Sequence, residues 1–289
     1  MTLSDDRLGV VMIHGLISGP KVWQPLQRLI AGDGALRFVE ALPFEYATGV
    51  KRLHPLRVFP SIDTVADSLK EFLVTEAGDF ERLMLVTHSQ GGLVAQRYLA
   101  RMLADGEGRE LARIRRIVML ACPNNGSELL LSLRRNVLGL RHPQEKDLRP
   151  LNDQVTATLR TVLRDVVQTP TLSDRTCPID INVYAGESDR VVPPASAQSV
   201  FPKSAALPGD HSTILKVESA EHRTFTTLRR LILTTPAKVS TPTAQPSTPQ
   251  GPITNTISGG ISYGPIIQAG SVHMPFPDWP ANEENEPQI

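Results

Sequence analysis

Short apolar runs alternate with amphipathic segments over residues 1 to about 235. Five runs rich in apolar and β-branched residues predict buried strands: 9–13, 36–42, 82–87, 114–121 and 179–185. Apolar residues at helical spacing predict helices at 20–30, 61–74 and 91–104, the second with Ser61 as its N-cap. Continuous apolar strands that alternate with helices are typical of a parallel sheet covered on both faces. The pattern therefore predicts an α/β domain at 1–235.

Residues 123–178 interrupt this alternation. The segment is helical in character, with leucines at 129, 130, 131 and 133 and a second helix at about 155–167. An insertion between two strands of such a sheet would lie over the ligand crevice, so we interpret it as a cap. The apolar and basic mixture at 129–141 fits either a core-facing helix with a solvated edge or contact with a lipid interface.

The composition changes near residue 236. Residues 236–252 are mostly Pro, Ser, Thr, Ala and Gln, which is typical of a linker. A motif at 253–275 follows, and an acidic end predicted to be disordered closes the chain at 276–289. The tail is therefore expected to be separate from the α/β domain.

Charge and cysteine content exclude several classes of function. The 289 residues carry 30 basic and 30 acidic side chains, which argues against nucleic-acid binding. No run reaches the roughly 18 apolar residues of a membrane span, and the N-terminus does not resemble a secretory signal, so a cytoplasmic location is expected. Cys122 and Cys177 fit neither a metal-ligand spacing nor a disulfide framework, and we expect both to be buried as small apolar residues.

A candidate nucleophile follows the third predicted strand. Residues 85–92 read L-V-T-H-S-Q-G-G and lead into the helix at 91–104. A sharp turn between strand and helix lifts the hydroxyl of Ser89 above the sheet edge and points the helix N-terminus at it. Gly91 and Gly92 leave room for the turn, whereas Thr87 stands where the G-x-S-x-G pattern has glycine and makes the packing tighter.

Three further segments complete the pattern. The loop G-E-S-D-R-V-V-P follows the strand at 179–185 and contains Asp189, and G-D-H-S contains His211. H-G-L at 14–16 ends the first strand, where a second oxyanion donor is expected. Serine, aspartate and histidine come in the chain order of an α/β-hydrolase triad.

With these motifs and A-C-P-N-N-G-S at 121–127, the sequence resembles the α/β-hydrolase family over about residues 8–232. Within that family it is most similar to lipase-like serine esterases related to the GPI inositol-deacylase and SERAC-type groups. The resemblance implies Ser89 as nucleophile, His211 as general base and later acid, and Asp189 as the carboxylate that orients the imidazole. The backbone N–H groups of Leu16 and Gln90 would hold the oxyanion, and no metal or organic cofactor is required.

Other titratable residues have weaker cases. His88 adjoins the serine, but side chains of adjacent residues diverge at a sharp turn, which favours a packing role. His14 is expected to brace the oxyanion loop. Glu187 lies on the same loop as Asp189 and is the alternative carboxylate for orienting His211. Asp210 is a weaker candidate, because His211 directly follows it in the chain and could not easily turn its ring back onto it. Three histidines have no motif around them: His54, His142 and His222.

The tail contains the step Ile267-Gln268-Ala269-Gly270, which is similar to RHIM-like amyloid signalling motifs. Stacked copies could pair backbones and form glutamine ladders. The resemblance implies self-assembly, or templating by an NLR-type receptor, whereas the alternative is an unstructured tail with a few aliphatic residues.

The sequence thus predicts a cytoplasmic serine esterase of lipase-like type. It would cleave a carboxylic ester with an apolar acyl chain, which a membrane surface could supply, and act as an effector assembled through its tail. A non-catalytic binding or scaffold module is one alternative. Amide or thioester cleavage or acyl transfer on the same fold is another.

Overall fold

The computed structural model describes residues 7–16, 18–47, 61–124, 145–192, 198 and 200–237, with backbone alone for 145–152. In this part of the chain a six-stranded, all-parallel sheet has the order β2-β1-β3-β4-β5-β6. The strands are β1 (Leu8–Ile13), β2 (Val39–Phe44), β3 (Leu83–His88), β4 (Ile114–Leu120), β5 (Asp180–Gly186) and β6 (Ser204–Leu207). The expected α/β architecture with a parallel sheet is confirmed.

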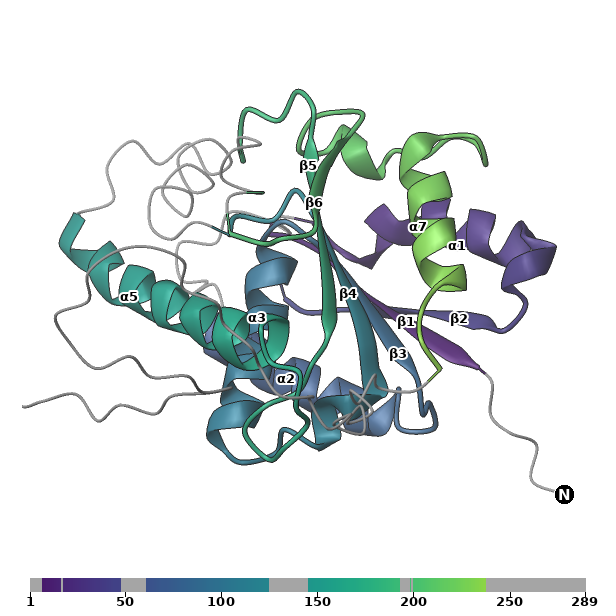
Figure 1. The fold of residues 1–289 in the computed structure, drawn as a ribbon. Coiled ribbons are helices and arrows are strands. Elements are labelled where there is room, and N and C mark those ends of the chain that lie inside the picture. The colour runs from purple at the N-terminus through teal and green to yellow at the C-terminus, as the bar shows by residue number, and fades with distance from the viewer. Residues whose placement is uncertain are drawn as a thin grey trace, which may run out of the picture. The chain divides into compact units, whose positions relative to one another are not determined.

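Helices cover both faces of the sheet. The α-helices are α1 (Gln24–Gly32), α2 (Ile62–Thr75), α3 (Gln90–Ala104), α5 (Glu145–Val162) and α7 (Arg223–Leu233). Short 3₁₀ turns are η1 (Pro20–Trp23), η2 (Gly34–Leu36), η3 (Glu110–Arg113) and η5 (Thr213–Leu215), and α5 continues into the π-helical turn η4 (Leu163–Val167). Helices α2, α3 and α5 lie on one face of the sheet, and α1 and α7 lie on the other (Figure 1).

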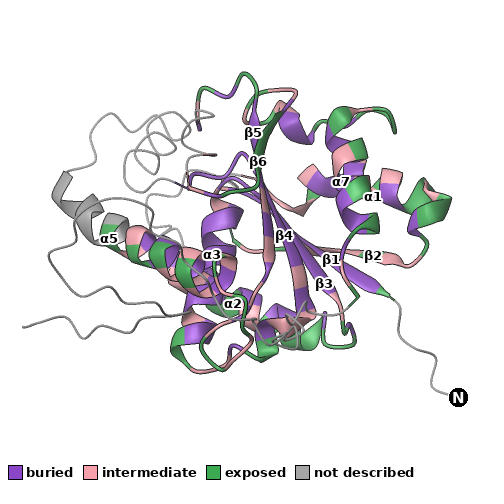
Figure 2. Cartoon of the chain, viewed as in Figure 1, coloured by how far each residue is buried: buried purple, intermediate pink, exposed green. Residues whose placement is uncertain are grey.

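Alternate residues of each strand contribute to two apolar cores. Val11 and Leu85 point into the core beneath α2, α3 and α5, whereas Val10 and Met84 point into the core beneath α1 and α7. All six residues of β1 and of β3 are buried, as Figure 2 shows for the central strands. Burial on both faces explains why these strands are continuous apolar runs in the sequence.

Strand register brings the motif loops to one edge of the sheet. Ile13 pairs with Thr87 at the ends of β1 and β3, and Leu120 pairs with Tyr184 near the ends of β4 and β5. The chain passes from β1 outward to β2 and then returns to β3 on the other side of β1. The point where the strand order reverses is where an open parallel sheet forms its ligand crevice.

Two elements were not predicted from the sequence. Strand β6 is a short edge strand in which Leu207 alone is buried, so it lacks an apolar run. Helix α7 buries Phe225, Leu228 and Leu231 at helical spacing.

Strand β2 begins later than expected because the Asp33 side chain accepts from the Ala35 N–H and caps the 3₁₀ turn η2.

The predicted insertion is described only in part. Helix α5 packs on α3, and Val155, Leu159 and Val162 join the core on that face. This half of the insertion is therefore a layer of the domain, and residues 125–144, where the rest of the predicted cap falls, lie outside the described residues. Ser61 caps α2 as predicted, its hydroxyl accepting from the Thr64 N–H at 3.1 Å.

The tail predictions also fall outside the described residues, which end at 237. The linker, the assembly motif at 267–270 and the acidic end therefore remain predictions from the sequence. Among the helices of the described ranges, none has the length and apolarity needed to cross a membrane.

Candidate active site

Ser89 forms a strained turn between β3 and α3. Its φ of 53° and ψ of −127° lie in a region that residues other than glycine rarely adopt, at a cost of about 1–3 kcal/mol. A Cβ on Gly91 would lie 2.5 Å from the Ile13 carbonyl oxygen, and one on Gly92 would lie 2.5 Å from Cys122 Sγ. Only glycine lets the first turn of α3 approach the neighbouring loops this closely.

The structure brings Ser89, His211 and Asp189 into hydrogen-bond contact. The Nε2 of His211 lies 2.9 Å from Ser89 Oγ, and its Nδ1 lies 3.0 Å from Asp189 Oδ2. Since a carboxylate only accepts, Nδ1 carries the proton and Nε2 of the neutral ring can accept from the serine hydroxyl. The three residues come from the loops after β3, β5 and β6.

The Asp189 carboxylate is fixed on both oxygens. Its Oδ1 accepts from the N–H groups of Val191 and Val192, each at 2.8 Å. The residue is 4% exposed. A Cβ on Gly186 would lie 2.8 Å from the Gly209 carbonyl oxygen. Glycine at 186 therefore allows the loop after β5 that carries Asp189 (the acid loop) to pack closely on the loop after β6 that carries His211 (the histidine loop).

The two predicted oxyanion donors, the N–H groups of Gln90 and Leu16, belong to segments that adjoin Ser89 or pass close to it. Gln90 is the first residue of α3, and the first N–H groups of a helix have no acceptor within it. The loop after β1 approaches so closely that a Cβ on Gly15 would lie 2.7 Å from Ser89 Cβ. Leu16 follows directly, so this loop lies beside the serine, where the sequence predicts the second oxyanion donor.

His14 and Tyr46 support that loop. Their rings stack at 4.2 Å between centroids with an angle of 2° between planes. The Tyr46 hydroxyl donates to the His14 carbonyl at 2.8 Å, and His14 Nδ1 donates to the Gly15 carbonyl at 3.0 Å. Burial lowers the pKa of His14 and raises the pKa of the Tyr46 hydroxyl. Tyr46 was missed from the sequence, although its place just after β2, the strand beside β1, was a usable signal.

Thr87 fits beneath the turn because its neighbour is small. Its hydroxyl lies 3.3 Å from Cys122 Sγ, and both residues are fully buried. Burial raises the pKa of the Cys122 thiol to about 12. Cys122 and Cys177 are both free and buried, as expected.

The other titratable residues weighed from the sequence lie outside the hydrogen bonds that join Ser89, His211 and Asp189. Glu187, the rival acid, pairs with Arg223 at 3.0 Å on the surface. Asp210 accepts from the N–H groups of Ser212 and Thr213, which lower its pKa. The His222 side chain accepts from the Thr224 N–H and caps α7. His54 and His142 are outside the described residues.

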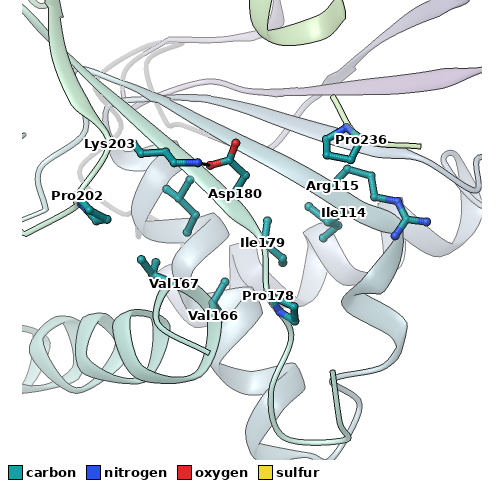
Figure 3. A pocket seen from close by; sticks show the side chains of 11 residues that line it. Ile114, Arg115, Val166, Val167, Pro178, Ile179, Asp180, Pro202, Lys203 and Pro236 are labelled. Carbon is teal, nitrogen blue, oxygen red and sulfur yellow. Dashed lines mark hydrogen bonds and ion pairs between the residues drawn. The ribbon is translucent and has the colours of Figure 1, made fainter. Parts of the chain in front are cut away.

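A pocket of about 250 Å³ lies elsewhere on the domain (Figure 3). It is lined by Ile114 and Asp180, which begin β4 and β5, so it opens at the opposite edge of the sheet from Ser89. Its Lys203 and Asp180 side chains pair at 2.6 Å. In the ranges the structure describes, no group of three or more His, Cys, Asp or Glu could hold a metal ion.

Comparison with families of known proteins agrees with this arrangement. Residues 10–239 match the Alpha/beta hydrolase family. The chain belongs to this family. A comparison with curated proteins gives no match.

Three solved structures are similar to this chain, and the two with a TM-score above 0.5 share its fold. Phospholipase PlaB from Legionella pneumophila matches at a TM-score of 0.59 and 15% identity, over 79% of this chain and 60% of that one. PlaB in complex with thio-NAD matches at a TM-score of 0.59 and 17% identity, over 80% of this chain and 59% of that one. The RedJ thioesterase of the prodiginine pathway in Streptomyces coelicolor matches at a TM-score of 0.47 and 19% identity, over 76% of this chain and 84% of that one. At 15% and 17% identity, the two PlaB structures support the fold of this alpha/beta hydrolase and nothing more.

Proposed function

We propose that the protein is a serine hydrolase that cleaves carboxylic esters through Ser89, His211 and Asp189. The observation that carries the proposal is the unbroken chain of hydrogen bonds from Asp189 through His211 to Ser89 Oγ, at 3.0 and 2.9 Å. The strained backbone of Ser89 supports it, because such strain concentrates at reactive turns.

In the proposed reaction, Ser89 Oγ attacks the ester carbonyl while His211 Nε2 takes the hydroxyl proton. The carbonyl oxygen becomes an oxyanion held by the N–H groups of Gln90 and Leu16. Loss of one such donor raises the activation free energy by roughly 3 kcal/mol. The C–O bond then breaks, and the alcohol leaves with the proton from His211. Water, deprotonated by His211, attacks the acyl-enzyme and releases the carboxylic acid and free Ser89.

The acyl group is proposed to be apolar, as in a lipid ester. The support is the leucine-rich sequence at 129–133, which lies in the undescribed part of the insertion. A substrate panel of p-nitrophenyl acetate, butyrate and decanoate, with matched thioesters and amides, tests both the chain length and the bond. Faster cleavage of the amides or thioesters would contradict the ester assignment.

Ser89→Ala provides the direct test of the mechanism. We expect it to abolish ester hydrolysis and labelling by a fluorophosphonate probe, because no other hydroxyl lies on His211 Nε2 in the described residues. Ser204→Ala, on the exposed edge strand β6, serves as the control and should label like the wild type. Persistent labelling of Ser89→Ala would remove Ser89 from the mechanism. A lipidomic comparison of cells that express either protein would identify the ester class.

The tail is proposed to assemble the enzyme as a cytoplasmic effector, by itself or on an NLR-type receptor. Support comes from the sequence step at 267–270. An isolated peptide of residues 253–275 should form thioflavin-positive fibrils, and Gln268→Asp should prevent this because stacked carboxylates repel. A wild-type peptide that stays soluble at high concentration would contradict the assembly proposal.

A further inference from the structure

His88 is buried at the junction of three loops of the candidate site. It ends β3 directly before Ser89 and is 7% exposed. Its ring centroid lies 5.1 Å from that of His211. On its other side the ring faces the loop after β1, since a Cβ on Gly15 would lie 3.2 Å from His88 Nδ1. No step of the ester mechanism uses this side chain.

One hydrogen bond fixes the ring. His88 Nε2 lies 2.6 Å from the backbone carbonyl oxygen of His211. A carbonyl only accepts, so Nε2 carries the proton and donates. This bond links the serine turn to the histidine loop through atoms that do not react.

The other ring nitrogen cannot readily be protonated. Nδ1 is buried and has no hydrogen-bond partner in the described part of the chain. A proton there would place a buried N–H against Gly15. Burial lowers the pKa of His88 to about 4, so the ring is neutral near pH 7 and keeps one tautomer.

Apart from the reacting contact of His211 Nε2 with Ser89 Oγ, the other hydrogen bonds of the histidine loop in the described residues tie it to itself or to the acid loop. Asp210 Oδ1 accepts from the N–H groups of Ser212 and Thr213, and the Gly209 carbonyl accepts from the Ser188 N–H at 3.1 Å. These contacts set the shape of the loop. They do not fix its distance from the serine turn, which the His88 bond does.

We propose that His88 is a positioning residue: its Nε2–H holds the backbone of His211 so that the imidazole stays within hydrogen-bond reach of Ser89. This inference rests on the proposed function. His211 must take the proton from Ser89 and then deliver it to the leaving alcohol without leaving its place. Displacement of a catalytic group by about 1 Å lowers the rate roughly 100-fold.

Two substitutions separate the hydrogen bond from mere packing. His88→Leu fills similar space without a donor, whereas His88→Gln can present an amide N–H near the position of Nε2. We expect His88→Leu to lower kcat for p-nitrophenyl butyrate about 100-fold with KM changed less than about threefold. His88→Gln should recover most of the loss. His222→Asn, which keeps the cap of α7, controls for removal of a histidine.

Fluorophosphonate titration counts the folded active sites in each variant, so a loss of protein is not mistaken for a loss of rate. Equal loss in His88→Leu and His88→Gln, or a loss in KM rather than kcat, would overturn the positioning role. A wild type that neither labels nor hydrolyses esters would instead overturn the proposed function.

The tautomer can be tested without any substitution. Nitrogen-15 imidazole spectra of the wild type at pH 6 should show His88 neutral with its proton on Nε2. A neutral ring with its proton on Nδ1 has no donor at Nε2 for the His211 carbonyl, and this result would overturn the inference even if His88→Leu fails to fold.

Discussion

At the scale of single residues, the site depends on which atoms can donate and which can only accept. The Asp189 carboxylate only accepts, so in the neutral ring of His211 the proton is on Nδ1 and Nε2 faces the hydroxyl of Ser89 as an acceptor. The neighbouring carboxylate of Glu187 cannot do this, because it pairs with Arg223 at the surface. Two acids two positions apart therefore have different contacts.

Asp189→Asn should separate orientation from binding. An amide can hold His211 in the wrong tautomer, with the proton on Nε2, so we expect kcat to fall about 10⁴-fold with the fold intact. Steady-state kinetics on p-nitrophenyl butyrate would measure it. Glu187→Gln on the same loop should remain within about twofold of the wild type, since exposed pairs contribute little. The reverse ranking would make Glu187 the acid.

His88 should make stability depend on pH. Its pKa is 6.5 in an ordinary environment and about 4 in the folded protein. Between these values the unfolded chain binds more protons, so this contribution to stability is complete above pH 6.5 and is lost as the pH falls towards 4. The full loss would be about 3 kcal/mol.

Urea denaturation of wild type and His88→Gln at pH 7 and pH 5 would test this. We expect the stability difference between the two proteins to shift by about 2 kcal/mol against the wild type at pH 5. The charged and titratable groups that face His88, namely His211, Asp189 and His14, are present in both proteins, so their contributions largely cancel in the difference. An unchanged difference would show that folding does not lower the pKa of His88.

At the scale of elements, the start of α3 decides the geometry of the site. Gly91 and Gly92 let the helix begin against the loop after β1 and against Cys122. The sequence predicted this turn and its small residues. It did not show that the neighbours at Gly91 are backbone carbonyls, which cannot rotate away as a side chain can.

Gly91→Ala should therefore move the turn. Its Cβ would meet the carbonyl oxygens of Ile13 and His14 at 2.5 and 2.8 Å, so we expect a loss of about 1–3 kcal/mol of stability and slower fluorophosphonate labelling. Gly32→Ala, in α1 with nothing within 4 Å, should instead stabilise the protein by about 0.5–1 kcal/mol. Thermal denaturation of both would measure this. An unchanged melting temperature for Gly91→Ala would contradict the contact.

At the scale of the whole molecule, the family match and the described helices end close together. The match ends at residue 239, and α7 ends at Leu233. Thr235 is still buried, and its hydroxyl donates to the Leu231 carbonyl at 2.8 Å. The hydrolase domain is therefore expected to keep its core without the residues that follow.

A chain that stops after Ala237 should keep both the melting temperature and the ester hydrolysis of the full protein, because the contacts that join Ser89, Asp189 and His211 are made within residues 89–211. It should lose any assembly that depends on 267–270. Size-exclusion chromatography and the butyrate assay would measure the two properties. A marked loss of activity on truncation would mean that the tail contributes to the site.

The sequence by itself determined the parallel α/β fold, because strand burial on two faces leaves continuous apolar runs. It also predicted the serine turn and the loops that carry Asp189 and His211, because turn residues next to strands are local signals. The tertiary structure decided which atoms meet. Ser89 and His211 are 122 positions apart, and their contact depends on the register of four strands. The place of Tyr46 just after β2 was a usable signal, whereas the bond from His88 has no local signature, since the His211 carbonyl that accepts it comes from a distant loop.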